Sequence, residues 1–290
     1  MAEVEILHPG LFSSIQDKGR NGYRKFGVPQ SGAMDSFAAG MANLLLQNSP
    51  DAAVLEMTQQ GPKMRFLDPT KIVITGAELS PFLNDNPVEN NRIYQVKIGD
   101  VLSFGRRKTG CRAYLAVKGG FLTEEVLHSR SFYQDLTASE KLEKGMRLAI
   151  APTSENAEQT RVVVKPAEYM EDRQLEVFPG PEFDQLSAEE KSNLLKTPFS
   201  IDRNNNRMAI QLTEEVSNKL QPILTGPVIP GTVQLTPSGK LIVLMRDAQT
   251  TGGYPRVLQV SEKGINILAQ KVWGEQVEFV LSEKFKVPAT

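Results

Sequence analysis

The stretch Gly99-Asp-Val-Leu-Ser-Phe104 follows the pattern Gly-x-x-(Leu/Val)-x-(Phe/Ile), which returns at residues 145–150 and 274–279. A glycine allows a tight turn, and the alternating apolar residues after it predict a strand with one face in the core. The pattern occurs near the ends of both halves of the chain, which favours two related β-barrels over one sandwich. We therefore predict a mainly β protein with a few helices.

Runs of β-branched and apolar residues bounded by turn residues predict the strands. They lie at residues 71–76, 93–104, 112–117, 147–151, 161–165, 175–178, 207–212, 241–245, 256–260 and 277–281. One predicted helix begins at the N-cap Asp35 and ends at Asn48; another begins after Ser187, where Glu190 completes a capping box. A Pro-, Ser-, Asn- and Glu-rich stretch at residues 151–160 predicts a linker, which gives domains of residues 1–155 and 156–290.

Composition narrows the class of protein. The chain has 290 residues, a formal net charge of −1, one cysteine and two histidines. The near-neutral charge argues against a nucleic acid or a membrane surface as partner. The single cysteine excludes an internal disulfide and fits the cytoplasm.

The N-terminus lacks a signal-peptide pattern, and no apolar run is long enough to span a bilayer. The few His and Cys residues argue against a zinc site. The sequence contains no phosphate-binding glycine loop, so we expect any nucleotide to bind at an unusual site or on a partner protein.

Glycines and charged residues crowd the segment from residue 14 to residue 35. Glycine lets the backbone lie against a ligand, while Arg and Asp side chains bind anions or move protons. The binding candidates here are Gln16, Asp17, Arg20, Ser31 and Gly32, and Asp35 is a candidate for proton transfer. The alternative is a turn-rich entry to the first barrel, with Asp17 and Arg20 as a surface ion pair of little energetic value.

A second polar segment, Met-Arg-Asp-Ala-Gln-Thr-Thr-Gly-Gly-Tyr-Pro, occupies residues 245–255 and follows a strongly apolar strand. Arg246 and Asp247 offer a charged clamp and a candidate acid or base. The remaining contacts to a ligand are expected from Gln249, Thr250, Thr251, Gly252, Gly253 and Tyr254. The alternative is a hairpin turn at Gly252-Gly253, which explains the glycines but not the charged pair.

Two arginines outside these segments are weaker candidates. Arg207 lies in an Asn-rich run at residues 202–208, and Arg130 lies in Ser129-Arg-Ser131. Each has the charge to bind an anion, but Asn-rich runs are usually turns and surface arginines are common.

A series of sequence motifs spans almost the whole chain. They are Gln16-Asp17-x-Gly19-Arg20-x-Gly22-Tyr23, Gly27-Val28-Pro29-x-Ser31-Gly32-Ala33-Met34-Asp35, Glu56-x-Thr58-x-x-Gly61-Pro62, Ala116-Val117-x-Gly119-Gly120, Ser129-Arg130-Ser131-x-Tyr133, Asn206-Arg207-Met208, Pro230-Gly231-x-Val233-Gln234 and Gln249-Thr-Thr-Gly-Gly-Tyr-Pro255. In this order they resemble the biotin-dependent carboxyltransferase-like family. That family includes the C subunits of 5-oxoprolinases, allophanate hydrolase subunit 2, an antagonist of a histidine-kinase inhibitor and a region of urea amidolyase. The chain departs from it at His128, where the family usually has glycine.

The resemblance implies two cyclophilin-like β-barrel domains and a role as the C subunit of an ATP-dependent 5-oxoprolinase. With its A and B subunits, such an enzyme opens the lactam of 5-oxoproline to glutamate; ATP binds to this chain or to a partner, and no biotin is expected on this chain. A phosphorylated or carboxylated substrate calls for anion binding, a role that falls to Arg20, Arg207 and Arg246, with Asp35 and Asp247 for proton transfer and Gln234 for binding. Two alternatives stay open, namely a carboxyltransferase component of the urea amidolyase type and a regulatory antagonist of a kinase inhibitor.

Overall fold

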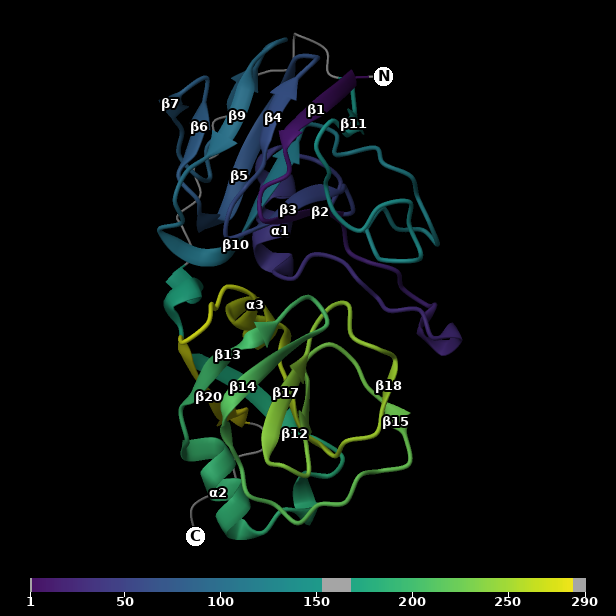
Figure 1. Cartoon of the computed structure of the whole chain (residues 1–290), viewed down its shortest axis with the longest axis vertical. Helices are drawn as coiled ribbons and strands as arrows, with labels where there is room; N and C mark the ends of the chain where they lie inside the picture. Colours follow the sequence, from purple (N-terminus) through teal and green to yellow (C-terminus); the bar gives the residue numbers. More distant parts are fainter. Residues whose placement is uncertain (1, 153–167, 284–290) are drawn as a thin grey trace. The chain divides into compact units, whose positions relative to one another are not determined.

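The computed structural model describes residues 2–152 and 168–283 (Figure 1). The chain divides into two compact units, the first made of Met1–Arg20 and Ser31–Ala167 and the second of Asn21–Gln30 and Glu168–Thr290. The domain boundary predicted at residues 155 and 156 and the strand predicted at residues 161–165 lie outside the described residues. No local sequence pattern predicts that the ten residues from Asn21 to Gln30 belong to the second unit.

The first unit is built from two antiparallel sheets. Strands of the six-stranded sheet are, in spatial order, β11 (Arg147–Ile150), β1 (Ala2–His8), β4 (Lys63–Phe66), β9 (Val101–Phe104), β6 (Pro81–Leu83) and β7 (Asn86–Pro87). Strands of the five-stranded sheet are β2 (Phe12–Gln16), β3 (Val54–Thr58), β10 (Thr109–Val117), β5 (Thr70–Glu78) and β8 (Tyr94–Val96). Single-residue bridges from Phe121 to Ala53 and to Ile150 tie the two sheets together.

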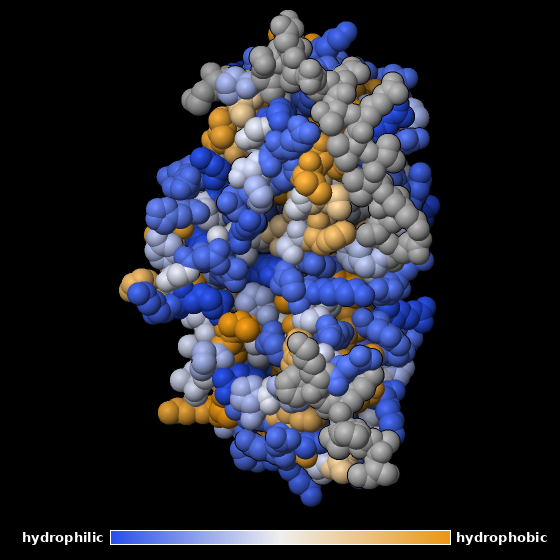
Figure 2. Space-filling view, turned by 180° about the vertical axis from the view of Figure 1, so that it is seen from behind, coloured by the Kyte–Doolittle hydropathy of each residue, from blue (hydrophilic) through white to orange (hydrophobic). Residues whose placement is uncertain are grey.

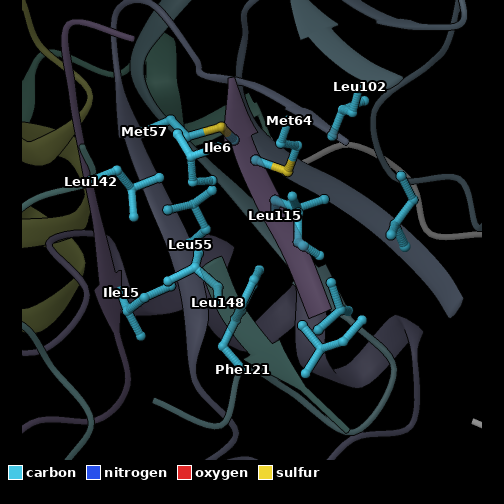
Figure 3. Packing of buried hydrophobic residues seen from close by; sticks show 14 of the residues in the cluster. Ile6, Ile15, Leu55, Met57, Met64, Leu102, Leu115, Phe121, Leu142 and Leu148 are labelled. Carbon is cyan, nitrogen blue, oxygen red and sulfur yellow. The ribbon is translucent and has the colours of Figure 1, made fainter. Parts of the chain in front are cut away.

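One hydrophobic core fills the space between these sheets. Strand side chains alternate between the two faces, so each strand sends every second residue inward. Figure 3 shows Ile6, Leu55, Met64 and Leu115 pointing toward one another from four different strands. All four are fully buried. Truncating such a buried side chain to alanine costs about 2–5 kcal/mol, so this core is the main source of stability of the unit.

The glycine pattern of the sequence marks three turns that lead into strands. Gly99, Gly145 and Gly274 have positive φ angles of 87°, 84° and 85°, in the left-handed region that favours glycine. Each lies two residues before a strand, namely β9, β11 and β20 (Gln276–Leu281). The predicted turn and strand are therefore confirmed at all three positions.

The second unit is a closed barrel. Its strands run in the order β12 (Gln174–Pro179), β19 (Arg256–Val260), β16 (Thr232–Leu235), β17 (Lys240–Leu244), β14 (Ala209–Glu215), β13 (Phe199–Asn205) and β20. Neighbouring strands pair antiparallel except β12 with β20, which closes the barrel with parallel strands. A two-stranded ribbon of β15 (Gly226–Pro227) and β18 (Thr251–Gly252) also belongs to this unit (Figure 1). The predicted fold class, mainly β with barrel domains, is confirmed.

Three α-helices occur among the described residues: α1 (Ser36–Leu45), α2 (Ala188–Lys196) and α3 (Glu262–Ala269). Short 3-10 helices are η1 (Arg24–Phe26), η2 (Glu168–Glu171) and η3 (Phe183–Gln185). The predicted N-cap Asp35 accepts a hydrogen bond from the Ala38 amide, and the predicted capping box of α2 is present. Helix α3 is not among the predicted helices; it is only eight residues long and has Ser261 as its N-cap.

The face of the molecule drawn in Figure 2 carries both hydrophilic and hydrophobic side chains. Figure 2 shows one face on which hydrophobic residues form small separate groups among hydrophilic ones. Such a mixed surface is ordinary, because there is not enough polar surface to cover a folded protein. Within the part of the chain that the structure describes, no helix is long and apolar enough to cross a membrane.

Candidate functional site

In the first unit, the candidate residues of the glycine-rich segment meet the loop at residues 129–131. The Asp17 carboxylate accepts hydrogen bonds from Ser129 Oγ at 2.7 Å, Ser131 Oγ at 2.7 Å, the Arg130 amide at 2.6 Å and the Gly19 amide at 2.8 Å. A carboxylate that accepts several such bonds is held firmly in place. Asp17 therefore joins two loops that are more than a hundred residues apart in the sequence.

Arg20 strengthens the same junction from inside the unit. Its side chain is fully buried and its Nη2 donates to the Ser131 carbonyl at 2.5 Å. Gln16 is also buried, and its Nε2 donates to Ser14 Oγ at 3.0 Å. The alternative in which Asp17 and Arg20 form a surface pair is wrong, because Arg20 has no exposed surface.

Ser31 and Gly32 form a tight turn against this junction. Both lie in the left-handed region, with φ angles of 58° and 91°. A Cβ on Gly32 would lie 3.0 Å from the Gly19 amide nitrogen, so the close packing of the two segments requires glycine there. Ser31 is buried, and its hydroxyl has no hydrogen-bond partner within the described ranges.

Asp35 has a structural task at the start of α1. Its carboxylate caps the helix, and its amide donates to the Tyr114 hydroxyl at 2.8 Å. Tyr114 in turn donates to Glu56 Oε2 at 2.9 Å, and that oxygen also accepts from the Met34 amide. Burial, together with the nearby carboxylates of Glu56 and Asp35, raises the pKa of Tyr114 well above its ordinary value. A role of Asp35 in proton transfer stays a prediction.

Arg130 is half-buried and its side chain serves the local loop. It donates to the Thr123 carbonyl and lies 3.4 Å from Glu125. Its neighbour His128 has a φ of 59°. In this left-handed region glycine is favoured, and histidine there carries a modest strain.

In the second unit, the structure brings Arg207 and Asp247 together. Arg207 Nε donates to Asp247 Oδ2 at 2.7 Å and Nη2 donates to Oδ1 at 3.0 Å, a two-pronged ion pair. The two side chains are only 8% and 12% exposed. The Asp247 amide also donates to the Arg207 carbonyl. The pair therefore fixes the start of the 245–254 loop to the turn between β13 and β14.

Arg246 points to a different partner. Its guanidinium pairs with Glu262, the first residue of α3. The Glu262 side chain is 59% exposed. Arg246 and Asp247 are thus each joined to another residue of this chain, and their roles in anion binding and proton transfer stay predictions.

Gln234 lies on the outer face of the barrel. Val233 and Leu235, its neighbours in β16, are fully buried in the barrel interior, so Gln234 points the other way. In the register of the sheet it stands opposite Ile242 of β17 and Arg256 of β19. Opposed residues on antiparallel strands share a face, so Arg256, Gln234 and Ile242 form one row across three strands.

The β15–β18 ribbon covers this row with glycines. Gly226 and Gly252 pair with each other across the ribbon. A Cβ on Gly226 would lie 2.8 Å from Arg256 Nη1, and one on Gly252 would collide with Gln234 Nε2. With glycine at both positions, the ribbon backbone can lie directly on these two polar side chains.

Arg256 and Glu182 form a second buried ion pair, which the sequence analysis missed. Arg256 Nη2 donates to Glu182 Oε1 at 2.8 Å, Nε donates to Oε2 at 3.0 Å, and Nη1 donates to the Pro227 carbonyl at 3.0 Å. The hydrogen bonds from Arg256 lower the pKa of Glu182. The pair anchors the ribbon to the barrel. Nothing in the local sequence could have found it, because its members are 74 residues apart.

Arg24, on the short helix η1, also meets this region. Its Nη2 donates to the carbonyl of Val228, which follows β15. Val228 packs with Leu244 and Ala248 in a small apolar cluster under the loop. Burial lowers the pKa of Arg24. Arg24 belongs to the glycine-rich segment but is not among the site residues predicted from the sequence.

The rest of the loop lies nearer the surface. Its exposed residues are Gln249, Thr251, Gly253 and Tyr254, and Thr250 and Gly252 are half-buried. The hairpin alternative is wrong, because Gly252 lies in β18 and pairs with Gly226. The structure thus gathers the loop, Gln234, Arg207 and Arg24 in the second unit, while the Asp17 junction belongs to the first.

A cavity of about 790 Å³ lies elsewhere in the second unit, lined by residues such as Asp172, Lys263 and Ser282. None of the predicted site residues lines it. Among residues 2–152 and 168–283, no group of three or more His, Cys, Asp or Glu side chains is placed to hold a metal ion.

Comparison with known proteins places the chain in a family. It is 31% identical to the C subunit of 5-oxoprolinase from Escherichia coli (strain K12) over 96% of this chain and 90% of that protein. It is 43% identical to the urea amidolyase of Lachancea kluyveri, over 44% of this chain and 7% of that protein. The crystal structure of TTHA0988 is similar with a TM-score of 0.87 and 27% identity over 97% of this chain; this chain spans 56% of that chain's length. The family described as carboxyltransferase domain, subdomain A and B, matches residues 26–281. This chain belongs to that family, as its motifs predict.

Proposed function

We propose that this chain is the C subunit of an ATP-dependent 5-oxoprolinase that hydrolyses 5-oxo-L-proline to L-glutamate together with A and B subunits. The observation that carries the proposal is the 31% identity to the C subunit of E. coli 5-oxoprolinase over 96% of this chain. The similarity extends over both compact units, as expected for chains that do the same work rather than share one domain.

The chemistry explains why such an enzyme needs ATP. A lactam carbonyl is a poor electrophile at neutral pH, so its oxygen is expected to be phosphorylated before water attacks. The second unit supplies groups suited to holding such a substrate: amide, hydroxyl and guanidinium donors gathered around one loop. The buried pair of Arg207 and Asp247 keeps that loop in place, which is the positioning that an efficient site requires.

We place ATP on a partner protein of the complex. Phosphate groups usually bind at a free helix N-terminus or a glycine-rich loop leading into one. In the described part of this chain each α-helix is already capped by its own side chain, namely Asp35, Ser187 or Ser261. These helix ends therefore offer no ready phosphate site, and the ATP site is better sought on the A or the B component.

The test is reconstitution. The chain is co-expressed with the A and B subunits of its own organism, and ATP-dependent release of glutamate from 5-oxoproline is measured. We expect turnover by the complex, none by this chain alone, and a stable pair of this chain with the B component that buries on the order of 2,000 Å². Full turnover by this chain alone, or no turnover by the complex, overturns the proposal.

A carboxyltransferase role is the second candidate. The description of the family and the 43% identity to a urea amidolyase over 130 residues favour it. In that case a biotin carboxylase and a biotin carrier should be encoded nearby, and the complex should transfer a carboxyl group to urea and not open 5-oxoproline. The same reconstitution, supplied with each substrate in turn, separates the two candidates.

A further inference from the structure

Four large apolar side chains are exposed next to the β15–β18 ribbon of the second unit. Leu224 is 100% exposed, Phe26 70%, Ile229 49% and Tyr254 40%. Apolar residues scattered singly over a surface are ordinary, but several that gather in one place usually mark a binding surface. The contacts of the ribbon decide which of these cases applies.

Leu224 and Tyr254 lie at one end of the ribbon. Leu224 precedes β15 by two residues and Tyr254 follows β18 by two, and the two strands are antiparallel. The Ile223 amide donates to the Gly253 carbonyl at 2.9 Å, and a Cβ on Gly253 would lie 4.0 Å from the Leu224 carbonyl oxygen. The two exposed side chains are therefore carried by neighbouring segments.

Ile229 and Phe26 lie at the other end. Ile229 follows β15 by two residues, and the carbonyl of its neighbour Val228 accepts a hydrogen bond from Arg24. That bond brings η1, which contains Phe26, to the ribbon. The ribbon is short, since the five residues from Leu224 to Ile229 span about 17 Å at most. All four side chains thus fit within the area of about 800 Å² that one partner contributes to an ordinary protein interface, and together they form what we call the ribbon surface.

The ribbon surface has a positive edge and no exposed acid of its own. Its charged residues are Arg24 and Lys25, and neither Asp nor Glu occurs in the segments that form it, residues 21–30, 220–231 and 248–255. Lys25 is exposed, and its Nζ lies 5.0 Å from the centre of the Phe26 ring. Two acids lie close by, but Asp247 and Glu182 are both buried in ion pairs with arginines.

We infer that the ribbon surface docks another protein, whose face is apolar at its centre and acidic at its rim. Exposed aromatic side chains and complementary charge are what such interfaces use. A second copy of this chain fits worse. A two-fold contact through the same surface sets Lys25 of one copy near Lys25 of the other, and like charges repel.

This inference rests on the proposed function for the identity of the partner, which is then the B component. TTHA0988 carries the same fold within a longer chain, since this chain spans 56% of that chain. A further protein region therefore accompanies this fold in that relative. Docking at the ribbon surface would also set the partner against exposed polar residues of the 245–254 loop, such as Gln249 and Thr251, so that a substrate bound there would contact both proteins.

The experiment measures the affinity of the purified full chain for the purified B component by calorimetry. Leu224→Glu and Ile229→Glu each place a negative charge within the ribbon surface and should weaken binding about thirtyfold or more. Lys25→Glu should weaken binding about threefold to tenfold, and more at low salt than at high salt, because a rim charge acts by long-range attraction. Ile98→Glu, at an isoleucine of the first unit that is 70% exposed, is the matched control and should bind normally.

Folding and other occupants are checked in parallel. Leu224 is fully exposed, so Leu224→Glu removes no packing and should melt within about 2 °C of the wild type. Sedimentation of the chain alone, and with vesicles of phosphatidylserine and phosphatidylcholine, tests for a second copy and for a membrane. Self-association or vesicle binding that Leu224→Glu abolishes overturns the inference, because the occupant is then not another protein of the complex.

The remaining outcomes separate the docking surface from the proposed function. Equal binding of the B component by the wild type, Leu224→Glu and Ile229→Glu, equal weakening by Ile98→Glu, or no binding by the wild type, overturns the inference. If the Leu224→Glu complex forms and releases glutamate like the wild type, the docking surface is refuted while the proposed function stands. If the B component binds through the ribbon surface and the wild-type complex never opens 5-oxoproline, the proposed function fails and the docking surface stands.

Discussion

Asp247 offers the most direct test of how the second unit is held together. Its carboxylate accepts two hydrogen bonds from Arg207, and the side chains are 12% and 8% exposed. Asp247→Asn keeps the shape but removes the negative charge, leaving the Arg207 guanidinium buried without this counter-ion. Breaking one side of a buried ion pair costs about 3–5 kcal/mol.

The expected loss is large enough to measure easily. For a unit of this size, each kcal/mol lowers the melting temperature by about 3–4 °C, so Asp247→Asn should melt about 9–20 °C lower. The motifs alone suggest that this change would abolish activity and leave the fold intact. The structure predicts instead that turnover and stability fall together.

Two further variants isolate the ion pair. Arg207→Met combined with Asp247→Leu replaces both charges by apolar groups, and should recover most of the stability that Asp247→Asn loses. Glu262→Gln breaks the pair with Arg246, whose carboxylate partner is largely exposed, and should cost less than about 1 kcal/mol. Calorimetric melts of the wild type and the three variants decide the matter. If Asp247→Asn and Glu262→Gln melt at the same temperature, the buried pair does not hold the loop.

Three other perturbations probe the junctions. Arg256 lowers the pKa of Glu182 below its ordinary value of 4.5, so the ion pair stabilises the fold above about pH 4.5 and loses this effect as the pH falls through the lowered pKa. The difference in melting temperature between the wild type and Glu182→Gln should therefore shrink in acid. A difference that stays constant with pH would refute this. Gly252→Ala should lower the melting temperature modestly, because the buried Gln234 amide or the ribbon must shift to make room for the Cβ, whereas Gly253→Ala, whose Cβ would meet nothing closer than 3.5 Å, should be neutral. Asp17→Asn should destabilise the first unit by about 2–3 kcal/mol in a urea titration, and an unchanged midpoint would show that its hydrogen bonds are worth little.

Features whose physical cause lies within a few residues are predictable from the sequence. Asp35 caps α1 and Ser187 with Glu190 forms the capping box of α2, because a cap joins a side chain to an amide three residues away. The glycine turns before β9, β11 and β20 are local in the same sense. By contrast, the Asn-rich run at residues 202–208 predicts a turn, yet its first part belongs to β13. That segment is a strand because it pairs with β14 and β20, which no local pattern records.

The candidate site is predictable in part. The loop at residues 245–254 and Gln234 do belong to one region, since Gly252 lies directly over the glutamine. The interactions that organise the region join residues far apart in the chain. Arg207 and Asp247 are 40 residues apart, Glu182 and Arg256 are 74 apart, and Arg24 reaches the Val228 carbonyl across 204 residues. Only the folding of the barrel brings these groups together.

Chemical type alone does not reveal what a charged side chain does in the folded chain. Chemical type favours Asp35 and Asp247 for proton transfer and Arg246 for anion binding, because acids and arginines do such work in active sites. In the folded chain Asp35 caps a helix, Asp247 holds Arg207, and Arg246 holds Glu262. A ligand competes with such partners and gains little. A hydrogen-bond donor that is buried without a partner gains more from a ligand, because folding has already removed that donor from water.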